Sequence, residues 1–182
     1  MTCSTYLIFH DTVVYMKAPI CNVCLKSDVL CSNCKEKKEN GEINELEIQI
    51  SRKLKELSDE YGSLRDSEIL HIYDTENVVV VVTAEGDGAK VVGRSGEIVK
   101  KVAEEIDKSI RVVEKSENDR EVIKGLLSPA EIESINTVFA PDGEHQKIVA
   151  DEQYEGKINM SEEEFEEIIE KITGTKYLLN FE

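Results

Sequence analysis

Apolar residues recur at steps of three and four between about Asn44 and Tyr61, which is typical of the buried face of an amphipathic helix. Gly62 follows this pattern at the place where a left-handed helix cap is expected. Residues 67–73 predict a strand, and the continuous β-branched run at 77–83 predicts a central strand that is buried on both faces. The apolar positions of the helix are Leu46, Ile50, Leu54 and Leu57.

Residues 89–115 predict a short helix, a loop that contains glycines, a longer helix and a third strand. The longer helix runs from about Glu97 to Lys108, with apolar residues at steps of four. The strand at 109–115 completes a unit whose elements follow the order α-β-β-α-α-β. Residues 128–181 predict the same order a second time, which indicates a distant internal repeat.

In this second unit the first helix is expected to begin at Ser128, so that residues 117–129 are a linker. Ser128 is the expected N-cap, Pro129 the first helical residue, and Glu131 the partner in a capping box. The later elements are expected as strands at 135–141 and 145–150 joined by an Asp142-Gly143 turn, a short helix at 151–155, a helix at 161–173 with Gly174 at its end, and a strand at 176–181.

Two C-x-x-C turns are separated by six residues, at Cys21 and Cys24 and at Cys31 and Cys34. Each turn brings two thiolates together, and four soft thiolates without a nearby histidine favour Zn²⁺. The sequence therefore predicts one structural Zn²⁺ in a compact module that has almost no core of its own. Redox disulfides and an iron–sulfur cluster remain as alternatives. The residues expected to be bystanders are Cys3, His10, His71 and His145.

The chain is strongly acidic, with 38 Asp and Glu residues against 22 Lys and Arg residues and a net charge of −16. Residues 117–182 hold 17 acids and 6 bases, a net charge of −11, so residues 1–116 carry the remaining −5. A field of this sign repels phosphate, and nucleic-acid binding therefore requires a local, shaped site. The simplest interpretation of the acids is solvated helix faces.

The segment KVVGRSGEIVKK at 90–101 is the best candidate for such a site. Its two glycines allow a sharp reversal and a close ligand approach, and the next helix offers N–H groups to an anion. The alternative is a plain turn between two helices packed on a sheet. The candidate contacts are Lys90, Gly93, Arg94, Ser95, Gly96, Lys100 and Lys101 for the phosphate backbone, and Val91, Val92, Ile98 and Val99 for a cleft floor beneath the bases.

Residues 91–99 resemble the V-I-G-x-x-G-x-x-I signature of KH domains, and the element order resembles the type II form of that fold. The resemblance implies that the loop binds about four nucleotides of a single strand. The equivalent loop of the second unit, at 156–159, lacks the second glycine, has Ile158 at its tip and is surrounded by glutamates. We therefore expect a degenerate KH domain there, which packs on the first unit or meets a protein.

A four-cysteine module followed by two such units resembles the archaeal NusA-like proteins over residues 16–182. The resemblance implies an α+β chain with a mobile or extension segment at 1–16, a zinc module at 17–41, a KH domain at 42–116 and a degenerate KH domain at 117–182. It also implies a single-stranded RNA-binding adaptor in transcription elongation or termination, with RNA polymerase or the ribosome as partner. The alternatives are a protein–protein scaffold that has lost RNA binding and a ribosome-associated or RNA-processing factor.

The remaining expectations are negative. No phosphate-loop lysine motif, G-x-S-x-G elbow or H-E-x-x-H motif occurs, so we expect no enzymatic activity and no small-molecule substrate. No run of 18 apolar residues occurs, and residues 1–15 lack the features of a signal peptide, so we expect a cytoplasmic protein. Met16 would be a natural start of the chain, as an alternative to Met1.

Overall fold

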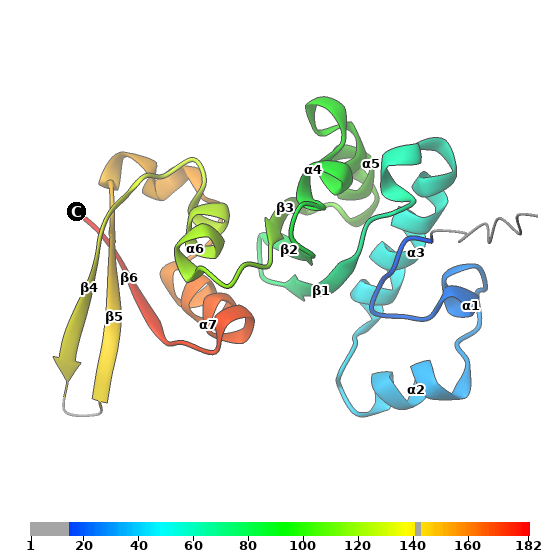
Figure 1. The fold of residues 1–182 in the computed structure, drawn as a ribbon, viewed down its shortest axis with the longest axis horizontal. Helices are drawn as coiled ribbons and strands as arrows, with labels where there is room; N and C mark the ends of the chain where they lie inside the picture. Colours follow the sequence, from blue (N-terminus) through cyan, green and yellow to red (C-terminus); the bar gives the residue numbers. More distant parts are fainter. Residues whose placement is uncertain (1–14, 141–142) are drawn as a thin grey trace, which may run out of the picture.

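The computed structural model describes residues 15–140 and 143–182. It consists of an N-terminal module and two α+β units, which follow one another across Figure 1. The N-terminal module holds α1 (Asn22–Leu25) and α2 (Ser32–Glu39). The first unit holds α3 (Glu45–Glu60), η1 (Gly62–Leu64), β1 (Ile69–Asp74), β2 (Val78–Thr83), α4 (Gly88–Val92), η2 (Arg94–Gly96), α5 (Glu97–Ile106) and β3 (Ser109–Glu114). The second unit holds α6 (Asp119–Leu127), β4 (Ile132–Ala140), β5 (Gly143–Ala150), η3 (Glu152–Lys157), α7 (Glu162–Thr173) and β6 (Tyr177–Phe181).

Each unit contains a three-stranded sheet, and the two sheets share one topology. In the first sheet β2 pairs antiparallel with β1 and parallel with β3. In the second sheet β5 pairs antiparallel with β4 and parallel with β6. The prediction of an α+β chain with the same element order in both units is therefore confirmed. Within the described ranges, no helix is long and apolar enough to span a membrane.

Helix α3 forms where the apolar periodicity predicts it. Asn44 and Glu47 make a capping box, in which each side chain accepts a hydrogen bond from the other residue's N–H. Glu47 is almost fully buried, and this burial raises the pKa of its carboxyl group. The predicted glycine cap at the other end is wrong. Tyr61 is the C-cap, and Gly62, which does not have a positive φ, begins the 3₁₀ turn η1.

Strand β2 confirms the prediction of a strand buried on both faces, since all six of its residues are buried. Successive side chains point to opposite faces of a sheet, so the strand contributes to two cores. Val79 and Val81 pack with α3 and α5, in a cluster that includes Leu54 and Ile98. The opposite face packs with α6 and α7, so the first sheet lies between two groups of helices. The residues that form this second contact include Val78, Val80, Val82, Leu126 and Phe165.

The position predicted for the first helix of the second unit is wrong. The helix is α6, which lies within the predicted linker, and Asn118 caps it by accepting a hydrogen bond from the N–H of Arg120. Ser128 ends this helix, Pro129 follows it, and the next residues enter β4. The reason is burial, because the apolar face of α6 packs against the first sheet and outweighs a local Ser-Pro-x-Glu capping signal. The buried residues of α6 are Val122, Ile123, Leu126 and Leu127.

The other predicted elements of the second unit are present. The short helix is η3, and α7 begins with a capping box between Ser161 and Glu164 and ends at Gly174 in the left-handed conformation. Of the predicted Asp142-Gly143 turn, Asp142 lies outside the described residues.

Met16, the last residue of the predicted N-terminal segment, is part of the folded structure. Met16 is 1% exposed and belongs to the first core, because the chain at this point runs along β1. The N–H of Lys17 donates to the carbonyl of Ser67 at 2.9 Å, and the N–H of Ile69 donates to the carbonyl of Lys17 at 2.9 Å. Residues 1–14, with Cys3 and His10, lie outside the described part.

The guanidinium group of Arg111 links β3 to the second unit. It donates to the carbonyl oxygens of Ser128 at 2.5 Å, Ile158 at 3.1 Å and Gly125 at 3.4 Å. Two of these oxygens are at the C-terminal end of α6, where the helix dipole favours a cation. Burial lowers the pKa of Arg111, so these carbonyl oxygens replace water around its charge.

We expect Arg111→Met to lower the free energy of unfolding by roughly 2–3 kcal/mol, because it removes three hydrogen bonds from a largely buried charged donor to carbonyl groups of the second unit. Urea denaturation measures the change. Arg65→Met is the matched control. Arg65 also donates to carbonyl groups at the end of a helix, those of Ser58 and Asp59, but it is exposed, and we expect a loss below about 1 kcal/mol. Equal losses in the two variants would contradict a linking role for Arg111.

Candidate functional sites: a cysteine cluster and a glycine loop

The four predicted cysteine ligands lie together, and their sulfur atoms are all within 4.8 Å of one another. The Sγ atom of Cys21 is 3.5 Å from that of Cys24 and 3.9 Å from that of Cys31. Four sulfurs at about 2.3 Å from a central Zn²⁺ in a tetrahedron are about 3.8 Å apart, so the cluster has the size of a metal site. Cys34 completes the set, and the cysteines are not joined by disulfides.

Backbone N–H groups lie near the sulfur atoms. The N–H of Cys31 donates to Cys24 Sγ at 3.1 Å. The N–H of Cys24 lowers the pKa of Cys21 to about 7, whereas burial raises the pKa of Cys24 to about 12. A cation at the centre would stabilise all four cysteines as thiolates, and hydrogen bonds from N–H groups would further stabilise their negative charge. The donor set therefore fits a soft metal ion.

The cysteine module is packed onto α3. Cys24, Leu25 and Cys34 belong to the same buried cluster as the first sheet, and the Nε atom of Arg52 on α3 donates to the carbonyl of Cys24 at 3.2 Å. The module therefore has little core of its own, as predicted, and its buried residues pack in the core of the first unit.

The glycine loop connects α4 to α5 through a strained backbone. Gly93 has φ 75° and ψ 174°, a conformation found almost entirely in glycine, and Gly96 is left-handed with φ 75° and ψ 19°. Ser95 is also left-handed, with φ 54°. A Cβ atom on Gly93 would lie 2.6 Å from Cγ1 of the buried Ile98, so glycine is required there by packing as well.

This loop leaves hydrogen-bond donors open. The N–H groups of Gly93 and Gly96 bond to the carbonyls of Ala89 and Gly93, but those of Arg94 and Ser95 have no acceptor among the described residues. The side chain of Arg94 is exposed and has no partner in the same ranges, and Lys100 lies beside Gly96, with its Cε 4.0 Å from the Cβ that an alanine there would have. Two backbone donors and two cations thus face solvent at one point, which suits a phosphate.

The predicted loop residues differ in accessibility. Val91 and Ile98 are buried in the first core, so they support the loop from below and are closed to a ligand. Lys90 is held by Asp66 and Asp87, and Lys101 by Glu60. Each of these two lysines is therefore partly neutralised, and their ion pairs raise their pKa values.

A cleft of about 490 Å³ opens beside the loop, between α4, β3 and α6. Val92 lines it, as predicted for the cleft floor, but Val99 does not. The other apolar residues of its wall are Ala89, Val112 and Val113, and Gly125 contributes from α6. A Cβ on Gly125 would lie 3.2 Å from Val113 Cγ1, so this glycine lets α6 approach β3 and close the cleft. Sequence reasoning missed the α6 wall because it placed the helix elsewhere.

Glu114 is a second residue that the sequence analysis missed. Its carboxylate accepts hydrogen bonds from the N–H groups of Gly86, at 3.0 Å, and Gly88, at 2.8 Å. It therefore fixes the turn that leads into α4 and the loop. A Cβ on Gly88 would lie 2.7 Å from Glu114 Oε1, so the glycines of the EGDG segment were the available signal.

The equivalent segment of the second unit lacks these features. Gly156 and Lys157 end the 3₁₀ helix η3, and Lys157 lies over the ring of Tyr154. Ile158 was expected at the tip of the loop, but it is 1% exposed and packs in the second core. The segment is thus anchored by its own apolar residue.

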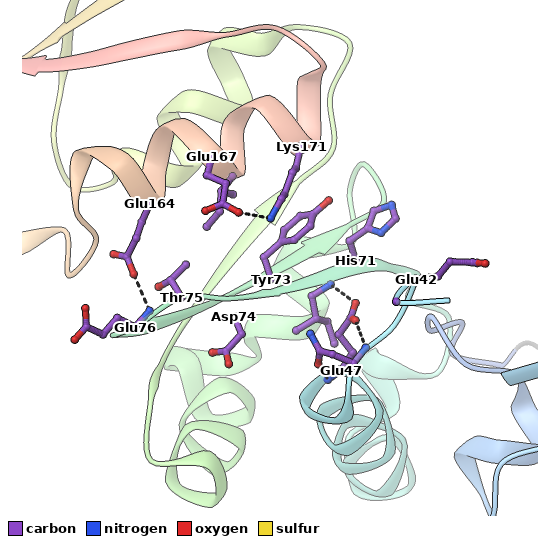
Figure 2. Close-up of a pocket in the computed structure, with 14 residues that line it drawn as sticks. Glu42, Glu47, His71, Tyr73, Asp74, Thr75, Glu76, Glu164, Glu167 and Lys171 are labelled. Carbon is purple, nitrogen blue, oxygen red and sulfur yellow. Dashed lines mark hydrogen bonds and ion pairs between the residues drawn. The ribbon is translucent and has the colours of Figure 1, made fainter. Parts of the chain in front are cut away.

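A second hollow, of about 580 Å³, lies between β1 and α7 and is acidic (Figure 2). Glu164 accepts a hydrogen bond from the N–H of Glu76 at 2.7 Å, which ties the β1–β2 turn to α7. Lys171 is paired with Glu167 and lies 5.8 Å from the ring of Tyr73. This hollow repels phosphate. Its carboxylates belong to Glu42, Glu47, Asp74, Glu76, Glu164 and Glu167.

Comparisons with known proteins give partial matches. No protein-family model matches the chain. The chain is 37% identical over 62 residues to the probable transcription termination protein NusA of Methanococcus vannielii. This match covers 34% of the chain and 35% of the relative, so about a third of the relative's length is spanned. The crystal structure of APE1850 resembles 72% of this chain and 96% of its own chain, with a TM-score of 0.51 and 22% identity, which concerns the fold.

Proposed function

We propose that the chain is a non-enzymatic, NusA-like protein that binds single-stranded RNA and acts in transcription elongation or termination. In this proposal the first unit is a type II KH domain and the second is a KH domain whose own loop has lost RNA binding. The partial match to a probable transcription termination protein supports the choice of transcription. RNA polymerase is the expected protein partner, and the cytoplasm the expected location.

The glycine loop is the observation that carries this proposal. It offers N–H groups at Arg94 and Ser95 and a guanidinium that have no partner among the described residues, beside a cleft with apolar side chains on its wall, in a protein that is otherwise acidic. A backbone phosphate would bind at the loop, and unstacked bases would rest against Ala89, Val92 and Val112. Since the field of the whole chain repels RNA, a shaped local site must supply the affinity.

The cysteine cluster is proposed to hold one structural Zn²⁺ through Cys21, Cys24, Cys31 and Cys34. The ion would contribute Lewis acidity to its thiolate ligands and no chemistry on a substrate. The ion would hold the module in its place on α3, and the outer face of the module would then be open to a protein partner.

We expect Arg94→Asp with Ser95→Asp to abolish binding of short single-stranded RNA without unfolding the chain, because both residues are exposed on the loop and two carboxylates would face the phosphate. Fluorescence anisotropy with a labelled four-nucleotide pool measures binding, and thermal melting checks folding. Lys35→Asp with Lys37→Asn on α2 makes the same change of three charges away from the loop.

Unchanged affinity in the loop variant would exclude the loop as the RNA site. Equal losses in both variants would show that net charge governs binding. Wild-type protein that binds no RNA would favour the alternative of a protein–protein scaffold, which the acidic hollow beside α7 makes physically reasonable because it suits a basic protein segment.

A further inference from the structure

The cations of this acidic chain are unevenly neutralised. Many lysines make ion pairs with carboxylates, such as Lys53 with Glu105 and Lys108 with Asp74. Other cations have side chains with no hydrogen-bond, ion-pair or ring partner among residues 15–140 and 143–182. Arg94 and Lys100 of this group lie at the glycine loop, and Lys115 lines the cleft beside it. Arg120 and Lys124 lie on α6, which forms a wall of that cleft, and the remaining members are Lys35, Lys37 and Lys176.

Two of these unpaired cations lie on α6 of the second unit. Arg120 and Lys124 are exposed and four residues apart, so they lie on one face of α6. The adjacent face carries Glu121 and Gly125, which form the wall of the cleft. One face of α6 therefore forms a wall of the cleft, and the neighbouring exposed face carries the two cations.

Another hollow, distinct from the acidic one beside α7, adjoins the face of α6 that carries these two cations. It has a volume of about 460 Å³ and is lined by Arg120, Lys124, Ser128 and Pro129 among others. Glu121 lines both hollows, so they meet on the surface of α6. A strand that leaves the cleft thus reaches the two cations directly.

We propose that single-stranded RNA bound at the glycine loop continues through the cleft and across α6, where Arg120 and Lys124 bind its next phosphates. This inference rests on the proposed function and assigns the second unit an RNA contact through α6 in place of its own loop. The occupant is an RNA segment longer than the four nucleotides that one KH loop binds.

The carboxylates along this route constrain how the RNA lies. Glu114 accepts hydrogen bonds from two backbone N–H groups, whereas Glu85 and Glu121 are exposed on the cleft. Glu131 lines the hollow beside Arg120 and Lys124. Phosphates would avoid these groups and follow the cations, with the bases turned toward the cleft. Carboxylates there can accept hydrogen bonds from base amino groups.

The test compares four-nucleotide and twelve-nucleotide single-stranded RNA pools by fluorescence anisotropy over a range of salt. We expect Arg120→Ala with Lys124→Ala to leave binding of the short pool unchanged and to weaken binding of the long pool about 25-fold at 0.1 M salt. The slope of log affinity against log salt should fall by about 1.4, since each phosphate contact contributes ~0.7 for a single strand. Lys35→Ala with Lys37→Ala, the charge-matched control on α2, should change neither pool.

The outcomes separate the two proposals. If the loop variant abolishes binding while the α6 variant leaves long RNA unaffected, the route across α6 is wrong and the proposed function stands. If the α6 variant weakens both pools equally, these cations belong to the loop site and the route is also wrong. If the wild type binds neither pool, the proposed function fails and this inference fails with it.

Discussion

Replacing Cys24 by serine is expected to abolish binding of the proposed Zn²⁺ and to lower the free energy of unfolding by about 5 kcal/mol, the range in which loss of a metal site falls. Cys24 is fully buried, so the substitution removes a ligand and leaves a hydroxyl group in an apolar environment. The loss should extend beyond the module, because Cys24 and Cys34 pack in the same cluster as Leu54 and Val79 of the first unit.

Metal analysis of the purified protein and hydrogen exchange of α1, α2 and α3 together measure this effect. Chelation of the wild type should reproduce it, with loss of about one zinc ion per chain. Cys3→Ser is the control, because Cys3 is not one of the four cysteines of the cluster. A coloured protein that contains iron would contradict the choice of zinc. Loss of protection confined to α1 and α2 would show that the shared core does not couple the module to α3.

The second large effect is expected at Gly93. Gly93→Ala should destabilise the chain by about 3 kcal/mol, because alanine is strained at φ 75° and ψ 174° and its Cβ would lie 2.6 Å from the buried Ile98 side chain. Gly96→Ala should cost only about 1 kcal/mol. Gly96 is in the ordinary left-handed region, and its Cβ would meet Val99 at 3.7 Å, an ordinary contact.

Chemical denaturation of the two single variants measures this difference directly. RNA affinity should not follow this order of stability. Both variants, once folded, keep Arg94 and the N–H groups of the loop. Equal destabilisation by the two substitutions would mean that the Ile98 contact relaxes at little cost, and the structural distinction between the two glycines would then be wrong.

Much of the fold is predictable from the sequence because local patterns and burial agree. The apolar periodicity of α3 and the β-branched run of β2 each have a single physical interpretation, and four cysteines at fixed spacing require only two turns to meet. The glycine loop is equally local, since the residues that need positive φ are the glycines and Ser95.

The errors have a common physical origin in contacts between distant segments. The Ser128-Pro129 pair carries a good capping signal, but the helix lies upstream, where Val122 and Leu126 meet the first sheet. Val91 and Ile98 occupy signature positions, yet tertiary packing turns them inward. The cleft wall on α6 could not be foreseen either, because it depends on the approach of Gly125 to β3 across the boundary of two units.

The two-sided burial of β2 has a consequence for synthesis of the chain. When the first 116 residues have left the ribosome, Val79 and Val81 can already pack, but Val78, Val80 and Val82 still lack the helices that cover them. Their apolar face is exposed until α6 and α7 follow, more than 50 residues later in the case of α7. The nascent first unit therefore passes through an aggregation-prone intermediate, and delayed or truncated translation should make it aggregate or recruit chaperones.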